Sequence, residues 1–131
     1  YRGTKNITGN YFSRIKKSAR IRGFDFSISI SYIQNLLELQ NYKCKISGVD
    51  IVMDPVGVAS KDYKNTASLD RIDSSKGYVE GNVQWVHKDL NKMKMDMEEK
   101  LFFHWCSVIH EHQTGAAVSA MCNSSKHKSS F

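Results

Sequence analysis

The chain has 131 residues, of which 40% are apolar and 24% are charged, and its formal net charge is +6. This length suits one domain with a modest core, and the composition is globular rather than that of a disordered chain. No run approaches the roughly 20 consecutive apolar residues of a membrane span, and no signal peptide opens the chain. We therefore expect a cytoplasmic protein without a membrane partner. The first residue is Tyr1 rather than Met, which is compatible with a piece of a longer protein.

The positive charge is concentrated near the amino-terminal end. Residues 1–22 contain no acidic residue, and their basic residues are Arg2, Lys5, Arg14, Lys16, Lys17, Arg20 and Arg22. Because Lys and Arg release counterions when they meet phosphates, a block of one sign favours a polyanionic partner such as nucleic acid. We expect residues 1–24 to form a basic helical segment that contacts double-stranded DNA.

The first predicted elements precede the polar segment that carries the chemistry. Between residues 11 and 22, apolar side chains recur at helical spacing, which predicts a helix that ends before Gly23. Residues 24–30 alternate apolar and polar side chains and predict a short strand or extended segment. Ser31 is the expected N-cap of a helix over residues 32–40.

The middle of the chain predicts short strands joined by loops. Residues 43–46 and 49–53 form two extended runs around a tight turn, and residues 54–67 have the composition of an exposed loop. A strand over 67–72, a loop over 73–77 and a second strand over 83–86 follow. These elements predict an α+β fold.

From about His87 onward, apolar residues recur at helical spacing, and this predicts helices up to residue 112. Leu90, Met93 and Met97 fall on one helical face, and a last helix is expected from Glu98 to His112. Residues 113–131 are rich in Ser, Ala and Lys, and we expect them to form a flexible tail.

The polar groups that could support chemistry converge between residues 68 and 94. Asp70 and Asn91 offer the hard oxygen ligands that Mg²⁺ prefers, and two protein ligands suffice for an ion that keeps several waters. Arg71, beside Asp70, has the guanidinium geometry that clamps a phosphate. A phosphodiester hydrolase needs a metal for the leaving oxygen, a base for water and a cation for developing charge.

Two segments of the chain resemble a known family. LDRIDSSKGYVEGNVQWVHKDLNKMK, residues 69–94, resembles the core of the HNH endonucleases, also called His-Me finger or ββα-metal nucleases. QNYKCKISGVDI, residues 40–51, is similar to the segment that precedes this core in many phage and restriction members. The DRID, GY, GN and N-x-x-K groups all fall at family-like spacing, and the likeness covers roughly residues 7–95.

This resemblance implies a fold and an activity. The fold is a ββα-metal core, a β-hairpin plus a helix, flanked by other helices within residues 25–112. The activity is hydrolysis of DNA phosphodiester bonds with Mg²⁺ or Mn²⁺, as in phage or restriction enzymes. Symmetric cutting of both strands by so small a unit would imply a homodimer, and nicking by a monomer is equally open.

The first strand departs from the family pattern at one position. Typical members have Asp-His or Asn-His there, and the His is the general base, whereas this chain has Arg71. A subgroup that includes the restriction enzyme PacI has a similar DR…GY…N pattern and a tyrosine in its active site. The resemblance therefore implies Asp70 and Asn91 as metal ligands, Arg71 as the holder of the scissile phosphate, and Tyr78 as the activator of water or the nucleophile.

Two residues compete for the role of base. An unperturbed tyrosine ionises near pH 10, so Tyr78 would need a metal or Arg71 beside it, and a core aromatic residue with a satisfied hydroxyl group is the ordinary alternative. His87 precedes Asn91 by four residues, which would place it on the same helical face as a competing base or ligand.

The other motif residues have supporting roles. Asn82 matches the middle Asn of the family motif, which braces the loop between the strands, and Asp73 is expected to cap that loop rather than bind a second metal. A solvated helix face explains Lys92 and Lys94 as well as DNA contact does. The residues that we expect to contact the DNA backbone are Arg14, Lys16, Lys17, Arg20, Arg22, Lys76, Lys92 and Lys94.

Family members often carry zinc-binding cysteine pairs around this core. Cys44 and Ser47 have the spacing of one such pair with a single thiol, and His87 and Leu90 have the spacing of the other. We therefore expect no structural zinc, since such sites need four nitrogen or sulfur ligands. The three cysteines fit unpaired thiols in a reducing compartment.

Because Arg71 stands where typical family members have the histidine that acts as general base, a second function is possible. A domain could keep the HNH-like fold and bind DNA without cutting it. The two functions differ in whether plasmid DNA is nicked in the presence of a divalent metal.

Overall fold

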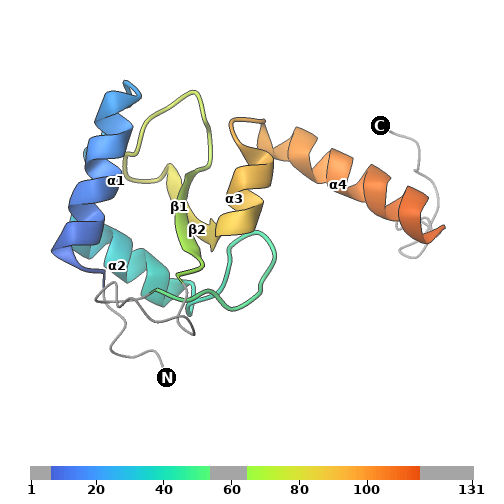
Figure 1. Cartoon of the computed structure of the whole chain (residues 1–131), viewed down its shortest axis with the longest axis horizontal. Coiled ribbons are helices and arrows are strands. Elements are labelled where there is room, and N and C mark those ends of the chain that lie inside the picture. Colours follow the sequence, from blue (N-terminus) through green and yellow to red (C-terminus); the bar gives the residue numbers. More distant parts are fainter. Residues whose placement is uncertain (1–6, 54–64, 116–131) are drawn as a thin grey trace. The chain divides into compact units, whose positions relative to one another are not determined.

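The computed structural model describes residues 7–53 and 65–115, which form helices and one β-hairpin (Figure 1). The elements in chain order are α1 (Gly9–Ile21), α2 (Ile30–Leu39), β1 (Ala67–Arg71), β2 (Val83–His87), α3 (Lys88–Lys94) and α4 (Glu99–Thr114). This mixture confirms the α+β class. The chain divides into one compact unit that ends at Asp96 and a second that begins at Met97. No helix in the described ranges is long and apolar enough to cross a membrane.

Helix α1 is part of the first unit's hydrophobic core. Its N-cap is Thr8, whose hydroxyl oxygen accepts a hydrogen bond from the Tyr11 amide at 3.1 Å. Ala19 is fully buried, and the Phe12 ring packs edge-to-face on Phe26 with 5.5 Å between centroids. The structure thus joins α1 to the hairpin core, whereas the sequence analysis separated residues 1–24 as a segment of their own.

Helix α2 begins two residues earlier than the sequence analysis predicted. Ser29, not Ser31, is the N-cap, and its Oγ accepts a hydrogen bond from the Tyr32 amide at 3.0 Å. Serine is a good cap at either position, so the pattern alone did not separate the two. Of the residues expected to face the core, Ile33 and Leu37 are fully enclosed and Leu36 is partly buried, whereas Leu39 is 83% exposed, so that part of the prediction was wrong.

The hairpin is antiparallel, and Leu69 of β1 lies opposite Trp85 of β2. Trp85 is fully buried, and its indole N–H donates to the Ile33 carbonyl at 2.9 Å. At the other edge of β2, the Gln40 amide side chain accepts from the Trp85 N–H at 3.0 Å and donates to the Trp85 carbonyl at 2.9 Å. Gln40 therefore satisfies backbone groups that a third strand would otherwise pair.

The extended segment after α1 lies against the loop that follows β1. A single parallel bridge joins Phe26 to Tyr78, and the Tyr78 amide donates to the Asp25 carbonyl at 2.8 Å. A Cβ atom added to Gly77 would stand 2.6 Å from the Asp25 carbonyl oxygen. Only glycine lets the loop lie this close to the segment.

The helical region after β2 is interrupted, so the predicted continuation through Met97 was wrong. Helix α3 ends at Lys94, and Met95 has a φ of 51°, outside the helical range. Met93 is 58% exposed, so its helical spacing does not mark a core contact. The helical spacing came from methionine side chains that do not pack into the core, since Met93 and Met95 are both exposed.

Helix α4 extends two residues beyond the predicted end. It continues through Gln113 and Thr114, and Gly115 follows in the left-handed conformation with a φ of 74°. The rest of the predicted tail, residues 116–131, and most of the predicted 54–67 loop, residues 54–64, lie outside the described residues.

Replacing Gly77 with Ala should destabilise the fold by about 1–3 kcal/mol, because the new Cβ must push the Asp25 backbone away. Urea unfolding measures this loss. Gly9→Ala is the matched control, because nothing lies within 4 Å of its added Cβ and alanine favours a helix. Equal unfolding free energies for the two variants would contradict the close approach at Gly77.

Candidate active site

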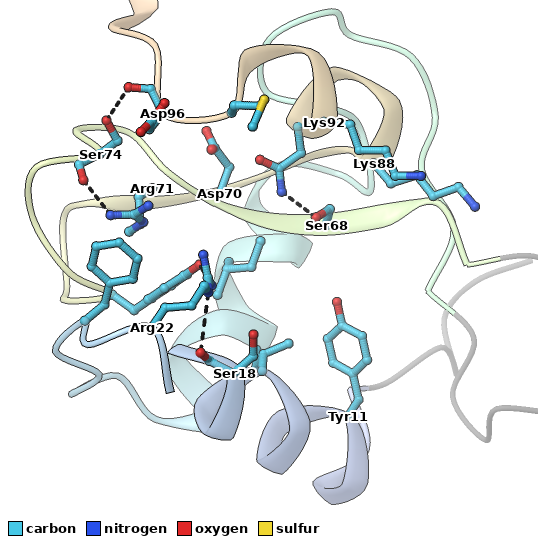
Figure 2. A pocket seen from close by; sticks show the side chains of 16 residues that line it. Tyr11, Ser18, Arg22, Ser68, Asp70, Arg71, Ser74, Lys88, Lys92 and Asp96 are labelled. Atoms are coloured by element: carbon cyan, nitrogen blue, oxygen red, sulfur yellow. Dashed lines mark hydrogen bonds between the residues drawn. The ribbon is translucent and has the colours of Figure 1, made fainter. Parts of the chain in front are cut away.

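A cavity of about 610 Å³ lies between α1 on one side and β1, the following loop and α3 on the other (Figure 2). It brings together residues that are far apart in the sequence. The predicted site residues that line it are Arg22, Asp70, Arg71, Tyr78, Asn91 and Lys92.

Asp70 is held at the end of β1 by two donors to the same oxygen. The residue is 4% exposed, and its Oδ2 accepts from the Lys94 ammonium at 2.6 Å and from the Gln84 amide at 2.9 Å. The Lys94 ammonium also donates to the Arg71 carbonyl at 3.0 Å. This buried ion pair ties the last residue of α3 to the end of β1.

The structure places Lys94 differently from both sequence interpretations. At 1% exposure its ammonium reaches neither solvent nor a DNA backbone. An unpaired carboxylate as enclosed as Asp70 would be costly, and the lysine at the end of the helix supplies the opposite charge. Lys94 is therefore a structural cation in this arrangement.

Asn91 faces the same cavity from α3. Its Nδ2 donates to the Ser68 hydroxyl oxygen at 2.6 Å. Ser68 precedes Asp70 by two residues on β1, so both side chains stand on one face of the strand. This hydrogen bond brings the Asn91 amide to the face that carries the Asp70 carboxylate.

The oxygen atoms around this face fit a hard divalent cation. Asp70, Asn91 and Asp96 line the cavity, and carboxylate and amide oxygens are the ligands that Mg²⁺ and Mn²⁺ take. Within residues 7–53 and 65–115, no three His, Cys, Asp or Glu side chains gather as a metal-binding group. An ion held here would therefore keep several water ligands, as Mg²⁺ does.

Arg71 is fixed against the loop between the strands. Its Nη1 donates to the Ser74 carbonyl and to the Lys76 carbonyl, the latter at 3.0 Å. The guanidinium carbon lies 3.6 Å from the centre of the Phe24 ring, a close cation–π contact. The group is thus positioned before any ligand arrives.

A second arginine joins this cluster from the end of α1. The Arg22 Nη2 donates to the Tyr78 hydroxyl oxygen at 2.8 Å, and its guanidinium carbon lies 5.2 Å from the centre of the Phe24 ring. The Arg22 and Arg71 guanidinium groups both lie against the Phe24 and Tyr78 rings. Their like charges repel each other, and a bound anion would offset that repulsion.

The charge of the cavity is positive. Four cations line it (Arg22, Arg71, Lys88 and Lys92) against two carboxylates (Asp70 and Asp96), a formal balance of +2. Lys94 neutralises Asp70 from behind, which raises the balance further. Such an arrangement attracts a phosphate or another anion.

Tyr78 and His87, the two candidate bases, occupy different places. Tyr78 lines the cavity, whereas His87 does not. His87 is the N-cap of α3, and its Nδ1 accepts from the Asp89 amide at 3.1 Å. Because a capping residue lies outside the helix, the four-residue spacing to Asn91 does not place the two side chains on one helical face.

Asn82 makes three hydrogen bonds across the loop. Its Oδ1 accepts from the Asp73 amide at 2.9 Å, and its Nδ2 donates to the carbonyls of Asp73 and Gly77 at 3.1 and 2.9 Å. Asp73 in turn accepts from the hydroxyl and the amide of Ser75, and these bonds hold the pKa of Asp73 below its ordinary value. These hydrogen bonds within the loop hold its backbone in one conformation, and the loop in turn supports Arg71 and Tyr78.

The other predicted DNA contacts lie outside the cavity. Arg14, Lys17 and Arg20 are exposed on α1, Lys16 is half-buried there, and Lys76 is exposed on the loop. These positions leave their charged ends available to a polyanion, which is what a backbone contact requires.

Sequence reasoning did not assign a site role to six polar residues that line the cavity: Tyr11, Ser18, Ser68, Ser74, Lys88 and Asp96. Tyr11 and Ser18 share a helical stripe with Arg22, and that spacing was the available signal. Tyr11 was assigned to the apolar face instead, since an aromatic ring at helical spacing is usually a core residue.

Cys44, half of a predicted cysteine pair, is buried beside His87. Its sulfur accepts from the Ser47 amide at 3.3 Å. Burial acts to raise the pKa of the Cys44 thiol, but hydrogen bonds from Ser47 and from the amides of His87 and Ile46 outweigh burial, and its pKa lies below the ordinary value. The His87 backbone amide thus lies beside the Cys44 sulfur, and the absence of a structural zinc stays a prediction.

The comparisons with known proteins give one distant relative to report. The chain is 31% identical over 97 residues to an uncharacterized 29.0 kDa protein in the dda-modA intergenic region of Enterobacteria phage T4. The match covers 69% of this chain and 36% of the phage protein, so the chain spans little more than a third of that relative. No family model and no solved structure matches the chain.

Removing either partner of the Asp70–Lys94 pair should destabilise the fold by about 3–5 kcal/mol, because the other charge stays buried alone. Asp70→Asn with Lys94→Met should cost less than the sum of the two single variants, as measured by urea unfolding at pH 7. The matched control is the exposed pair Lys43–Asp50, at 2.7 Å, whose removal should cost below about 1 kcal/mol. Additive losses at Asp70 and Lys94 would contradict the buried pair.

The stability of the fold should fall at high pH partly through Tyr11. Burial raises the pKa of Tyr11 to about 12 from the ordinary 10.0. The unfolded chain therefore ionises first, so this contribution is complete below pH 10 and is lost as pH rises toward 12. Tyr11→Phe should lose less unfolding free energy than the natural chain between pH 8 and pH 11. An equal loss in both proteins would argue against a buried hydroxyl.

Proposed function

We propose that this protein is a divalent-metal-dependent endonuclease that hydrolyses phosphodiester bonds of double-stranded DNA. The supporting observation is that one cavity is lined by residues from a strand, a loop and a helix. They are Asp70 and Arg71 of β1, Tyr78 of the loop and Asn91 of α3. They are the residues to which the HNH resemblance assigns metal binding, phosphate binding and activation of water. The proposal includes a ββα-metal core made of β1, β2 and α3, and a cytoplasmic site of action.

Asp70 and Asn91 would hold a Mg²⁺ or Mn²⁺ ion, with Asp96 on the same cavity wall. When bound, such an ion supplies a Lewis acid that stabilises the leaving oxygen. Both donors to Asp70 reach Oδ2, so Oδ1 is the oxygen that the carboxylate offers to the cavity. The Lys94 ammonium keeps that carboxylate in one orientation.

The two arginines would bind the non-bridging oxygens of the phosphate. Arg71 is already fixed by the Ser74 and Lys76 carbonyls, so its charge needs no reorganisation as negative charge develops. The Arg22 guanidinium carbon lies 5.9 Å from the centre of the Tyr78 ring, and the group would offer its remaining N–H donors to the phosphate. Planar guanidinium groups suit this task because their N–H donors match phosphate geometry.

Tyr78 is the candidate to accept the proton of the attacking water. Its oxygen accepts a hydrogen bond from the Arg22 guanidinium, and a cation at 2.8 Å stabilises negative charge on that oxygen. The Tyr78 hydroxyl proton points away from Arg22 and would first have to pass to bulk water, because only the phenolate oxygen can take a proton from the attacking water. The proposal favours Tyr78 over His87 for this task, because His87 caps α3 and does not line the cavity.

A second function has its own supporting observation. Asp70 is already neutralised by Lys94, and none of the histidines in the described ranges lines the cavity. A site of this kind could bind the phosphates of DNA without cutting it. The positive charge of the cavity serves either function.

Incubation with supercoiled plasmid distinguishes the two. The natural chain with Mg²⁺ or Mn²⁺ should produce nicked plasmid, and EDTA should abolish the product. Tyr78→Phe should lower the nicking rate by about 10²- to 10⁴-fold. Tyr32→Phe, which removes a hydroxyl bonded to the Gly81 amide outside the cavity, should leave the rate unchanged.

Asn91→Ala tests the metal assignment, because it removes a ligand oxygen without leaving a buried charge. It should slow nicking by about 100-fold, and Asn35→Ala on the exposed face of α2 is its control. DNA that is bound but never nicked would favour the non-cutting function. Full nicking by both Tyr78→Phe and Asn91→Ala would overturn the site.

A further inference from the structure

The cavity has a second wall, which the HNH resemblance does not describe. Tyr11, Ile15, Ser18 and Arg22 line it from α1 at spacings of four, three and four residues, so they form one stripe on the helix. Figure 2 shows Tyr11, Ser18 and Arg22 rising from α1 toward the strand that carries Ser68 and Asp70. Any ligand of the Asp70 wall therefore also faces this stripe.

The Tyr11 ring is held in place by its neighbours. It stacks on Trp85, with 6.3 Å between centroids and 27° between planes, and Trp85 is fully buried. The Arg14 guanidinium carbon lies 5.4 Å from the centre of the same ring. Aromatic contacts of this kind restrict the ring, so the hydroxyl group has one defined position in the cavity.

The Tyr11 hydroxyl makes no hydrogen bond to any residue of the described part of the chain. Burial is the main reason that its pKa rises to about 12, and Arg14 only partly opposes this. The group is thus a neutral O–H donor at physiological pH. A fixed donor in a positively charged cavity is suited to an anionic acceptor such as a phosphate oxygen.

We infer that α1 forms the second wall of a DNA-binding groove and that the Tyr11 hydroxyl donates a hydrogen bond to a backbone phosphate of the bound strand. This inference rests on the proposed function, because it takes the ligand to be DNA. Arg22, at the other end of the stripe, contacts the same DNA strand through its guanidinium group. The exposed basic residues of α1 then lie beside the groove and add attraction for the duplex.

The test measures DNA affinity without cleavage. A fluorescein-labelled 20-base-pair duplex is titrated with the full chain in EDTA, and anisotropy gives the Kd. Tyr11→Phe should weaken binding by about tenfold, the loss expected for one hydrogen bond to a charged acceptor. Tyr32→Phe is the matched control and should bind like the natural chain.

Two further readouts separate a contact from a structural effect. The Tm of Tyr11→Phe should equal or exceed that of the natural chain, because the lost hydroxyl has no partner inside the described protein. In the nicking assay, Tyr11→Phe should raise KM and leave kcat unchanged, since the bond forms on binding.

The outcomes distinguish this inference from the proposed function. A natural chain that nicks DNA and a Tyr11→Phe variant with unchanged Kd would overturn the role of Tyr11 and leave the nuclease intact. A weakened Kd accompanied by a lowered Tm would also overturn it, in favour of a packing role. A natural chain that neither binds nor nicks the duplex would remove both proposals.

Discussion

The buried ion pair between Lys94 and Asp70 determines how the parts of the site meet. It joins the end of α3 to the end of β1, and Gln84 adds β2 through the same carboxylate oxygen. Helix α3 cannot slide along the hairpin without leaving one of the two charges buried and unpaired, a cost of several kcal/mol. This constraint also fixes Asn91, one turn earlier on α3, against Ser68. A carboxylate and an amide from separate elements thereby face one cavity.

The same pair sets the electrostatics of that cavity. Because Lys94 pairs with the Asp70 carboxylate, that carboxylate does not neutralise the arginines and lysines that line the cavity. Arg71 is held by loop carbonyls, and that loop is braced by Asn82. Helix α1 closes the other side with Tyr11 and Arg22. The walls of one cavity thus carry carboxylate and amide oxygens together with cationic N–H donors.

Elements that repeat a clear period were predictable from the sequence, and contacts that depend on burial were not. Both strands appear within a residue of their expected limits, and Asp70 and Asn91 share a cavity as the motif implied. Lys94 was misassigned because a terminal helical lysine is ordinarily solvated, and only the enclosure of Asp70 reverses that preference. The prediction put His87 on the face of α3 that carries Asn91. Helix α3 begins at Lys88, one residue later than expected, so His87 is its N-cap. The phase of a helix is visible in a pattern, but its first residue is decided by packing.

NMR with Mn²⁺ is the sharpest test of the proposal that Asp70 and Asn91 hold a divalent cation in this cavity. Paramagnetic Mn²⁺ is added to the ¹⁵N-labelled full chain, and the broadening of each amide signal is followed. The amide signals of residues 68–71 and of Asn91 should broaden first, at Mn²⁺ concentrations that leave the amide signals of Glu38 and Asp50, two exposed carboxylates, sharp. Broadening around Glu38 and Asp50, with residues 68–71 unaffected, would contradict it.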